Sequence, residues 1–204
     1  MVAERRYGGL DADERAGERR ERLLAAELDV LSRQGWSSST VQDVCRAAGL
    51  SPRYLYEAFG SREALVLALL DRVADEAEAV ALAALAGEGD PEQRAARVLE
   101  SLTTYFTSDP RRIRVALMES LAAPAFRAKR RDLLESFGQL GARLMRPLRD
   151  MPSTSRHARA QLSMAASLLA GGLVELFIAW EVSGGRGALD VGVQTAVWTA
   201  AARS

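Results

Sequence analysis

Three side chains in the segment SPRYLYEAF, residues 51–59, could recognise a hydrogen-bonding partner. Arg53, Tyr54 and Glu57 occupy the side of a short helix, capped by Ser51, that its apolar residues leave free. Arginine donates hydrogen bonds to phosphates and base edges, and a carboxylate can accept one from cytosine. Backbone N–H groups at the start of such a helix also suit a phosphate. The chemistry indicated is recognition by hydrogen bonds.

Catalytic and metal-binding chemistry has few candidates in this chain. One cysteine, Cys45, and one histidine, His157, exclude an internal disulfide and a zinc site built from Cys and His. We find no glycine-rich turn between a strand and a helix that could cradle a phosphate. We therefore expect no enzyme activity, catalytic residue, cofactor or metal. Paired carboxylates are the one catalytic option left open, and Glu119 and Glu175 are the residues that would test it.

Helices must position these side chains, because the sequence carries no strand pattern. Alternating runs of Val, Ile, Thr and aromatic residues are absent, while Ala, Leu, Arg and Glu dominate. Capping residues, glycines and prolines predict an all-α chain of about nine helices. The predicted helices span residues 13–34, 41–48, 52–59, 62–85, 91–107, 110–121, 124–150, 156–182 and 190 to the C-terminus.

The second and third of these helices form a helix-turn-helix pattern. Thr40 caps the first of the two, with Asp43 as its reciprocal partner in a capping box. Gly49 allows a left-handed turn, and Leu55 anchors the second helix from beneath. Any corner between helices can supply such a pattern, so the residues alone leave both DNA binding and a structural corner open.

Residues 23–69, LLAAELDVLSRQGWSSSTVQDVCRAAGLSPRYLYEAFGSREALVLAL, resemble the N-terminal domain of the tetracycline-repressor-like (TetR) family of transcriptional regulators. The matching features are Gly35, the Thr40 cap, AAG-L-S at the turn, LY with Phe59, and SREAL. The resemblance covers about a quarter of the chain. It implies a three-helix DNA-binding domain joined by a long helix to a C-terminal helical bundle that binds a ligand and dimerises.

The resemblance also implies roles for single residues. Arg53 and Tyr54 become base readers, and Thr40, Tyr56 and Arg62 become phosphate contacts. Ala58 departs from the His or Tyr that the family often has. The candidate DNA-contacting residues are Thr40, Gln42, Ser51, Arg53, Tyr54, Tyr56 and Arg62.

Two alternatives stay open within this segment. Helix packing competes with DNA contact for both Tyr54 and Tyr56. Cys45 stands where the family usually has Ala, and we interpret it as a small buried core residue in preference to a redox sensor.

The predicted domains are a flexible arm over residues 1–12, a helix-turn-helix domain over 13–60 and a larger helical domain over 61–204. The net charge of zero means that attraction to DNA must come from local placement of charge. Arginines near the N-terminus could form an arm that reaches a minor groove, but because acidic residues are interleaved with them we interpret the segment as a solvated tail in preference. These arginines are Arg5, Arg6, Arg15, Arg19 and Arg20.

One recognition helix reads only a few base pairs, so we expect a homodimer on a palindromic operator. Helix 156–182 carries small residues along one stripe that would permit close contact with a second copy. TetR-like proteins dimerise through two such helices per subunit, which makes helix 124–150 its expected neighbour. Completion of the monomer core is the alternative. The stripe consists of Ser163, Ser167, Ala170, Gly171 and Val174.

The resemblance implies a small-molecule effector, which we expect to be largely apolar and to release a repressor from double-stranded DNA. Large apolar side chains could line its pocket, although most such residues are ordinary core. Glu175 could orient the effector or pair with an arginine. The candidate pocket residues are Phe106, Met118, Phe126, Phe137, Phe177, Trp180 and Glu175.

Residues 162–180 form the most apolar stretch of the chain and carry a single charge. We interpret this stretch as a helix buried between proteins in preference to a membrane span. The N-terminal sequence shows no secretory signal, and we expect a cytoplasmic protein. A helical protein-interaction module that has lost specific DNA binding is the alternative function.

Overall fold

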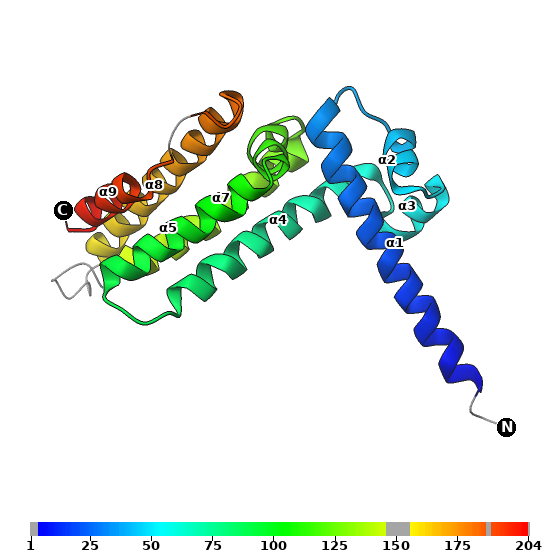
Figure 1. The fold of residues 1–204 in the computed structure, drawn as a ribbon, viewed down its shortest axis with the longest axis horizontal. Coiled ribbons are helices and arrows are strands. Elements are labelled where there is room, and N and C mark those ends of the chain that lie inside the picture. The colour runs from blue at the N-terminus through cyan, green and yellow to red at the C-terminus, as the bar shows by residue number, and fades with distance from the viewer. Residues whose placement is uncertain (1–3, 146–155, 187–188, 204) are drawn as a thin grey trace. The chain divides into compact units, whose positions relative to one another are not determined.

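The computed structural model describes residues 4–145, 156–186 and 189–203, and all regular structure in these ranges is helical (Figure 1). The prediction of an all-α chain is therefore confirmed. The chain divides into two compact units, residues 1–71 and 72–204. Helix α4, Arg62–Leu85, starts in the first unit and continues into the second.

Three helices precede α4 in the first unit: α1, Glu4–Gln34; α2, Val41–Ala48; and α3, Pro52–Phe59. Helix α1 begins at Glu4 and not near residue 13, so residues 4–12 are helical where an arm was expected. All four helices contribute to one core, because each presents an apolar stripe toward the others. Its buried side chains include Leu23, Leu31, Val44, Leu55, Leu65, Val66, Leu69 and Leu70.

The end of the first unit lies inside α4. Four of the core side chains, from Leu65 to Leu70, belong to the first turns of this helix. The first unit therefore extends to Asp71, past the boundary expected at residue 60.

Local capping signals fix both ends of α2. The Thr40 backbone N–H donates to Oδ2 of Asp43 at 3.0 Å, and the Asp43 backbone N–H donates to Oγ1 of Thr40 at 3.3 Å. Gly49 ends the helix with φ of 62°, a left-handed conformation that favours glycine. The predicted capping box and left-handed turn are confirmed.

Four longer helices build most of the second unit: α5, Pro91–Ser108; α7, Pro124–Met145; α8, Arg156–Val182; and α9, Val191–Arg203. Helices α7 and α8 lie side by side (Figure 1). Two glycines of α7 allow close approach, since a Cβ at Gly138 would lie 2.8 Å from Oγ of Ser167 and one at Gly141 would lie 2.7 Å from the Trp198 ring. Residues 146–150, predicted as the end of α7, lie outside the described residues.

The predicted helix 110–121 is not one regular helix. It consists of a short α-helix α6, Arg111–Ile113, a π-helical turn η1, Arg114–Met118, and a 3₁₀ turn η2, Glu119–Leu121. Ile113, Val115 and Leu117 are all buried. Alternate residues cannot all share one face of a regular α-helix, so the segment is enclosed on more than one side and its hydrogen-bond spacing changes to fit.

Candidate nucleic-acid interface

The turn between α2 and α3 is held by an arginine of α1. Nη2 of Arg22 donates to the carbonyl oxygens of Ala48 at 2.6 Å and of Gly49 at 3.2 Å. These acceptors lie at the C-terminal end of α2, where carbonyl groups lack helical partners and carry partial negative charge. A Cβ at Gly49 would lie 3.0 Å from the same nitrogen, so a side chain here would crowd the Arg22 contact in addition to straining the backbone angle.

Helix α3 buries one side and presents the other to solvent. Leu55 is fully buried against the first unit, which fixes the rotation of the helix about its axis. The side chain of Arg53 is 82% exposed, and Tyr56 and Tyr54 are 52% and 37% exposed. The face expected to be free for DNA is therefore the solvent face of α3.

Arg53 forms an ion pair within α3. Its Nε donates to Oε1 of Glu57 at 2.6 Å, and this hydrogen bond with the carboxylate charge raises the pKa of Arg53. The pair spans positions i and i+4 on an exposed surface, where such pairs contribute little to stability. Breaking the ion pair with Glu57 therefore costs little free energy, and a hydrogen bond from Arg53 to a phosphate or base edge can offset it.

Tyr54 is packed on one side by α1. The guanidinium of Arg19 lies over the Tyr54 ring at 4.8 Å from the centroid, and that of Arg20 lies over the Phe59 ring at 4.3 Å. The Tyr54 ring thus packs on one face and is still partly exposed, and DNA contact by Tyr54 stays a prediction.

Thr40, Gln42 and Ser51 lie on the surface of the first unit. The Thr40 hydroxyl donates to Oδ2 of Asp43 at 2.6 Å, and the two hydrogen bonds from Thr40 lower the pKa of Asp43. The hydroxyl is thus occupied in the capping box. Ser51 makes no side-chain capping hydrogen bond, although its position is that of the N-cap of α3.

The expectation that Arg62 contacts phosphate is corrected by its burial. Its side chain is 8% exposed and forms an ion pair with Glu27, which is fully buried, at 2.9 Å. The guanidinium also donates to the carbonyl oxygen and the hydroxyl of Ser39 and stacks on the Trp36 ring at 4.5 Å. Burial raises the pKa of Glu27, while the hydrogen bond and charge of Arg62 oppose this shift. Arg62 therefore links α4 to α1 and to the loop before α2.

Cys45 belongs to the core, as interpreted from the sequence. Its side chain is 3% exposed, and burial followed by the charge of Glu27 raises the pKa of the thiol. A buried thiol with a raised pKa has little thiolate at neutral pH and is chemically inert. Among the described residues, no group of three His, Cys, Asp or Glu side chains could hold a metal ion.

The large apolar side chains among the candidate pocket residues are buried or half-buried. Phe106, Phe126 and Phe177 are buried, and the rings of Phe106 and Phe177 pack at 5.0 Å between centroids. Met118, Phe137 and Trp180 are half-buried. These side chains form part of the packed interior of the second unit.

Glu175 of α8 is exposed, and an arginine of α7 responds to it. Burial lowers the pKa of Arg130, and the negative charge of Glu175 opposes that shift. The two charges are thus near enough to influence each other, and both roles for Glu175 stay predictions.

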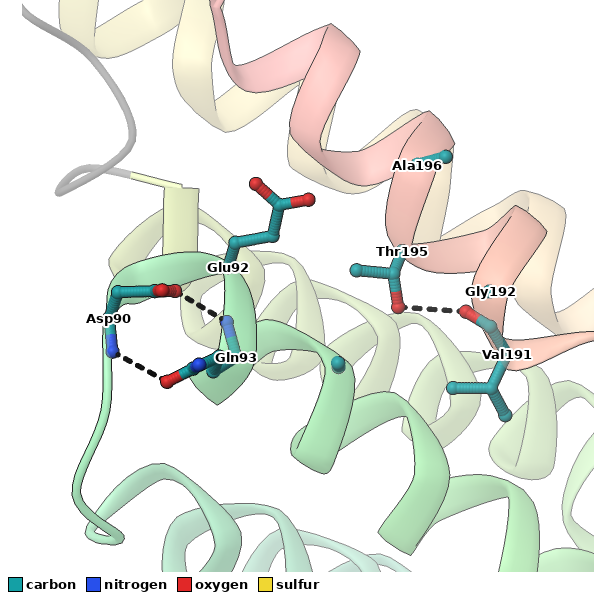
Figure 2. Close-up of a pocket in the computed structure, with 8 residues that line it drawn as sticks. Asp90, Glu92, Gln93, Val191, Gly192, Thr195 and Ala196 are labelled. Atoms are coloured by element: carbon teal, nitrogen blue, oxygen red, sulfur yellow. Dashed lines mark hydrogen bonds between the residues drawn. The ribbon is translucent and has the colours of Figure 1, made fainter.

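A hollow of about 440 Å³ lies instead between the N-terminal turns of α5 and α9 (Figure 2). The Asp90 and Gln93 side chains on its α5 side are engaged in a second capping box, with hydrogen bonds of 2.8 and 3.1 Å. Thr195 on its α9 side donates to the carbonyl oxygen of Val191 at 2.7 Å. The polar groups of this hollow are thus largely used within the protein. Its lining residues are Asp90, Glu92, Gln93, Ala96, Val191, Gly192, Thr195 and Ala196.

The small-residue stripe of α8 is only partly free. Ser167 lies over Gly138 of α7 in the same chain, so this part of the stripe completes the packing of the protomer. Ser163 is exposed, and Ala170, Gly171 and Val174 are half-buried.

Large apolar side chains are exposed on α8 beside the small ones. Their exposed fractions are 63% for Met164, 71% for Leu168, 48% for Leu176 and 70% for Val182. Within the described ranges, residues 160–182 of this helix are also the one segment long and apolar enough to cross a membrane, with a mean hydropathy of 1.9 and 17% of the window buried. One such helix is weak evidence for a membrane span.

Comparison with known proteins identifies the helix-turn-helix unit. Residues 23–69 match the family profile described as bacterial regulatory proteins, tetR family. The transcriptional regulator AlkX of Mycobacterium tuberculosis is 42% identical over 64 residues, and BetI of Rhizobium meliloti is 31% identical over 81 residues. The matched regions cover 29% and 40% of this chain and span 30% and 40% of those two relatives.

The fold similarity extends over most of the chain. The transcriptional regulator FadR of Bacillus subtilis, solved in complex with stearoyl-CoA, has a TM-score of 0.73 at 14% identity, covering 89% of this chain and 97% of FadR. A match at this identity establishes the fold alone. The relatives named are regulators and not enzymes. The profile match and the sequence similarity identify residues 23–69 as a segment of the tetR type, and the all-α fold of the chain is shared with regulators of known structure.

Proposed function

We propose that the protein is a transcriptional repressor that binds a palindromic DNA operator as a homodimer in the cytoplasm and is released by a small apolar effector. The observation that carries the DNA-binding part is the solvent face of α3, where Arg53, Tyr54 and Tyr56 are exposed beside a turn fixed by Gly49. A helix with a buried stripe and an exposed set of hydrogen-bond donors can enter a major groove and read base edges.

The apolar side of α8 supports the homodimer. Met164, Leu168 and Val182 are each more than three-fifths exposed in the protomer. Leaving such side chains in water is unfavourable, and a second copy of α8 would cover them symmetrically. Two DNA-binding units held by one interface would read two half-sites, which provides the specificity that a single α3 lacks.

The buried aromatic residues of the second unit support an apolar effector. The side chains of Phe106, Phe126 and Phe177 are buried, so an effector that entered this part of the second unit would contact apolar carbon. FadR of Bacillus subtilis, which shares this fold, is solved with stearoyl-CoA, whose acyl chain is apolar. A long-chain acyl-CoA is therefore the probe of choice.

Replacing Arg53 by alanine is expected to weaken specific operator binding by about 10- to 100-fold, because a good base contact contributes roughly 1–3 kcal/mol. The operator is first selected from a random duplex library with the wild-type protein and mapped by footprinting. Titration of the selected duplex then gives the dissociation constant. Arg33→Ala is the matched control, since Arg33 is an exposed arginine of the first unit that pairs with Asp29.

Two outcomes would count against the DNA-binding proposal. Failure of the wild-type protein to select any sequence at low and moderate salt would favour the interaction module that has lost DNA binding. A selected site that Arg53→Ala binds as tightly as the wild type would leave α3 without its assigned role. Protection of a single half-site would contradict the palindromic operator.

Stearoyl-CoA is expected to release the protein from its selected operator. If the effector binds the DNA-free conformation more tightly, linkage requires that it weaken DNA binding by the same factor. Titration of the complex with stearoyl-CoA, monitored by fluorescence anisotropy of the labelled duplex, measures this factor. Free coenzyme A is the control for the polar headgroup, and no release by the acyl form would overturn this choice of effector class.

A further inference from the structure

Three arginines of α1 contact the helix-turn-helix segment from the same short stretch of sequence. Arg22 donates to the last carbonyl groups of α2 and the turn, Arg20 covers the Phe59 ring at the end of α3, and Arg19 covers the Tyr54 ring at its start. All of these contacts lie within the first unit. Residues 19–22 therefore bear on both ends of α3 and on the turn that precedes it.

The contact of Arg19 with Tyr54 differs from the contacts of Arg20 and Arg22, because it holds a side chain that is assigned to base reading. Phe59 is half-buried at the C-terminal end of α3, and the turn carbonyls belong to the backbone. Tyr54 is 37% exposed and belongs to the face assigned to base reading. The Arg19 guanidinium, 4.8 Å from the ring centroid, attracts the ring electrostatically. This attraction favours the Tyr54 rotamer in which the ring lies beneath the guanidinium.

Such an attraction influences recognition because a free tyrosine loses side-chain entropy when it binds. A ring already held in its bound rotamer avoids that loss, and the hydroxyl is presented from a defined direction. We propose that Arg19 is a specificity-determining residue that acts through Tyr54, fixing the direction from which the Tyr54 side chain reads DNA. This inference rests on the proposed DNA-binding function.

Direct contact of Arg19 with a phosphate is the competing role. A phosphate contact would act independently of Tyr54, would weaken binding to every sequence alike, and would lower the salt slope by about one when removed. If Arg19 instead positions Tyr54, its effect should require Tyr54, should be confined to the selected operator, and should leave the salt slope unchanged. The two roles are therefore separable by measurement.

The test is a double-mutant cycle on operator binding with wild type, Arg19→Ala, Tyr54→Ala and the double variant. We expect Arg19→Ala alone to weaken binding to the selected operator by about three-fold, the size expected of an exposed cation–π contact. In the Tyr54→Ala background the same change should have no effect. Affinity for a random duplex and the salt slope should stay at their wild-type values, and so should the thermal unfolding midpoint.

Selection from a random library gives a second readout that a merely structural role would not change. We expect Arg19→Ala to relax base preference at the same operator positions as Tyr54→Ala, and at no others. Arg33→Ala, on the same helix and paired with Asp29, should leave the selected motif unchanged.

Each other result overturns the inference. Equal losses from Arg19→Ala with and without Tyr54, or a reduced salt slope, would assign Arg19 to phosphate. A lowered unfolding midpoint with an unchanged motif would assign it to stability. If the wild-type protein selects no site at all, the proposed function itself fails, which is distinguishable from a failure of coupling between Arg19 and Tyr54 in a protein that does select one.

Discussion

Replacing Arg62 by alanine is expected to lower the free energy of unfolding of the first unit by about 3–5 kcal/mol. The change would leave the fully buried carboxylate of Glu27 without its cation. It would also remove the two hydrogen bonds that Arg62 donates to the carbonyl oxygen and the hydroxyl of Ser39. An unpaired charge in an apolar interior costs far more than the ion pair itself contributes. Chemical denaturation followed by circular dichroism measures the loss.

The double variant Glu27→Leu with Arg62→Met separates charge from packing. Both charges are then absent, and buried ion pairs replaced by apolar residues of similar size are often neutral for stability. We expect the double variant to recover most of the stability that Arg62→Ala loses. Arg53→Ala, which removes an exposed arginine, should change stability by less than about 0.5 kcal/mol. A loss below about 1 kcal/mol for Arg62→Ala would contradict the buried geometry.

Leu168→Glu is expected to convert the protein to a monomer and to weaken operator binding on the order of 100-fold, because a carboxylate at the centre of an apolar interface is desolvated without a partner. Leu168 is 71% exposed in the protomer, so the change should leave the fold intact. Sedimentation equilibrium measures the molecular mass, and anisotropy titration measures operator binding.

Val193→Glu is the matched control for this variant. Val193 lies on α9 and is 61% exposed, so it introduces the same charge at an exposed apolar position outside the α8 surface. It should remain dimeric and bind the operator normally. A Leu168→Glu protein that stays dimeric would exclude this side of α8 as the interface.

Sequence signals predicted the parts of the fold that local chemistry determines. The Thr40–Asp43 box and Gly49 act over a few residues, and both are where the sequence places them. The prediction of one regular helix over residues 110–121 was wrong, because the segment contains π and 3₁₀ turns that no local sequence pattern reveals.

The candidate site shows the same division between local and distant chemistry. The exposure of Arg53 and Tyr56 followed from the buried position of Leu55 in the same helix. The burial of Arg62 did not, because its partner Glu27 is 35 residues away in the sequence. The contacts of Arg19 and Arg22 with the helix-turn-helix segment were also missed. Arginines among acidic neighbours have the pattern of a solvated surface, so the sequence does not indicate these distant partners.

On α8, the predicted small-residue stripe has larger exposed neighbours that the sequence analysis did not single out. Ser167 lies over Gly138 within the protomer and is still exposed, as is Leu168, next to it in sequence. Helical periodicity separates these two residues by about 100°. It does not reveal which of the two sides faces α7.

The position of the unit boundary inside α4 has a consequence for protein engineering. A chimaera that keeps the first unit and exchanges the second should be joined after Asp71, within the helix and without insertion or deletion. A junction in the loop at Gly60 would replace Leu65, Val66, Leu69 and Leu70 by residues of the other protein. The first unit would then lack the core side chains that its own α4 supplies. The transferable module of this protein therefore ends in the middle of a helix.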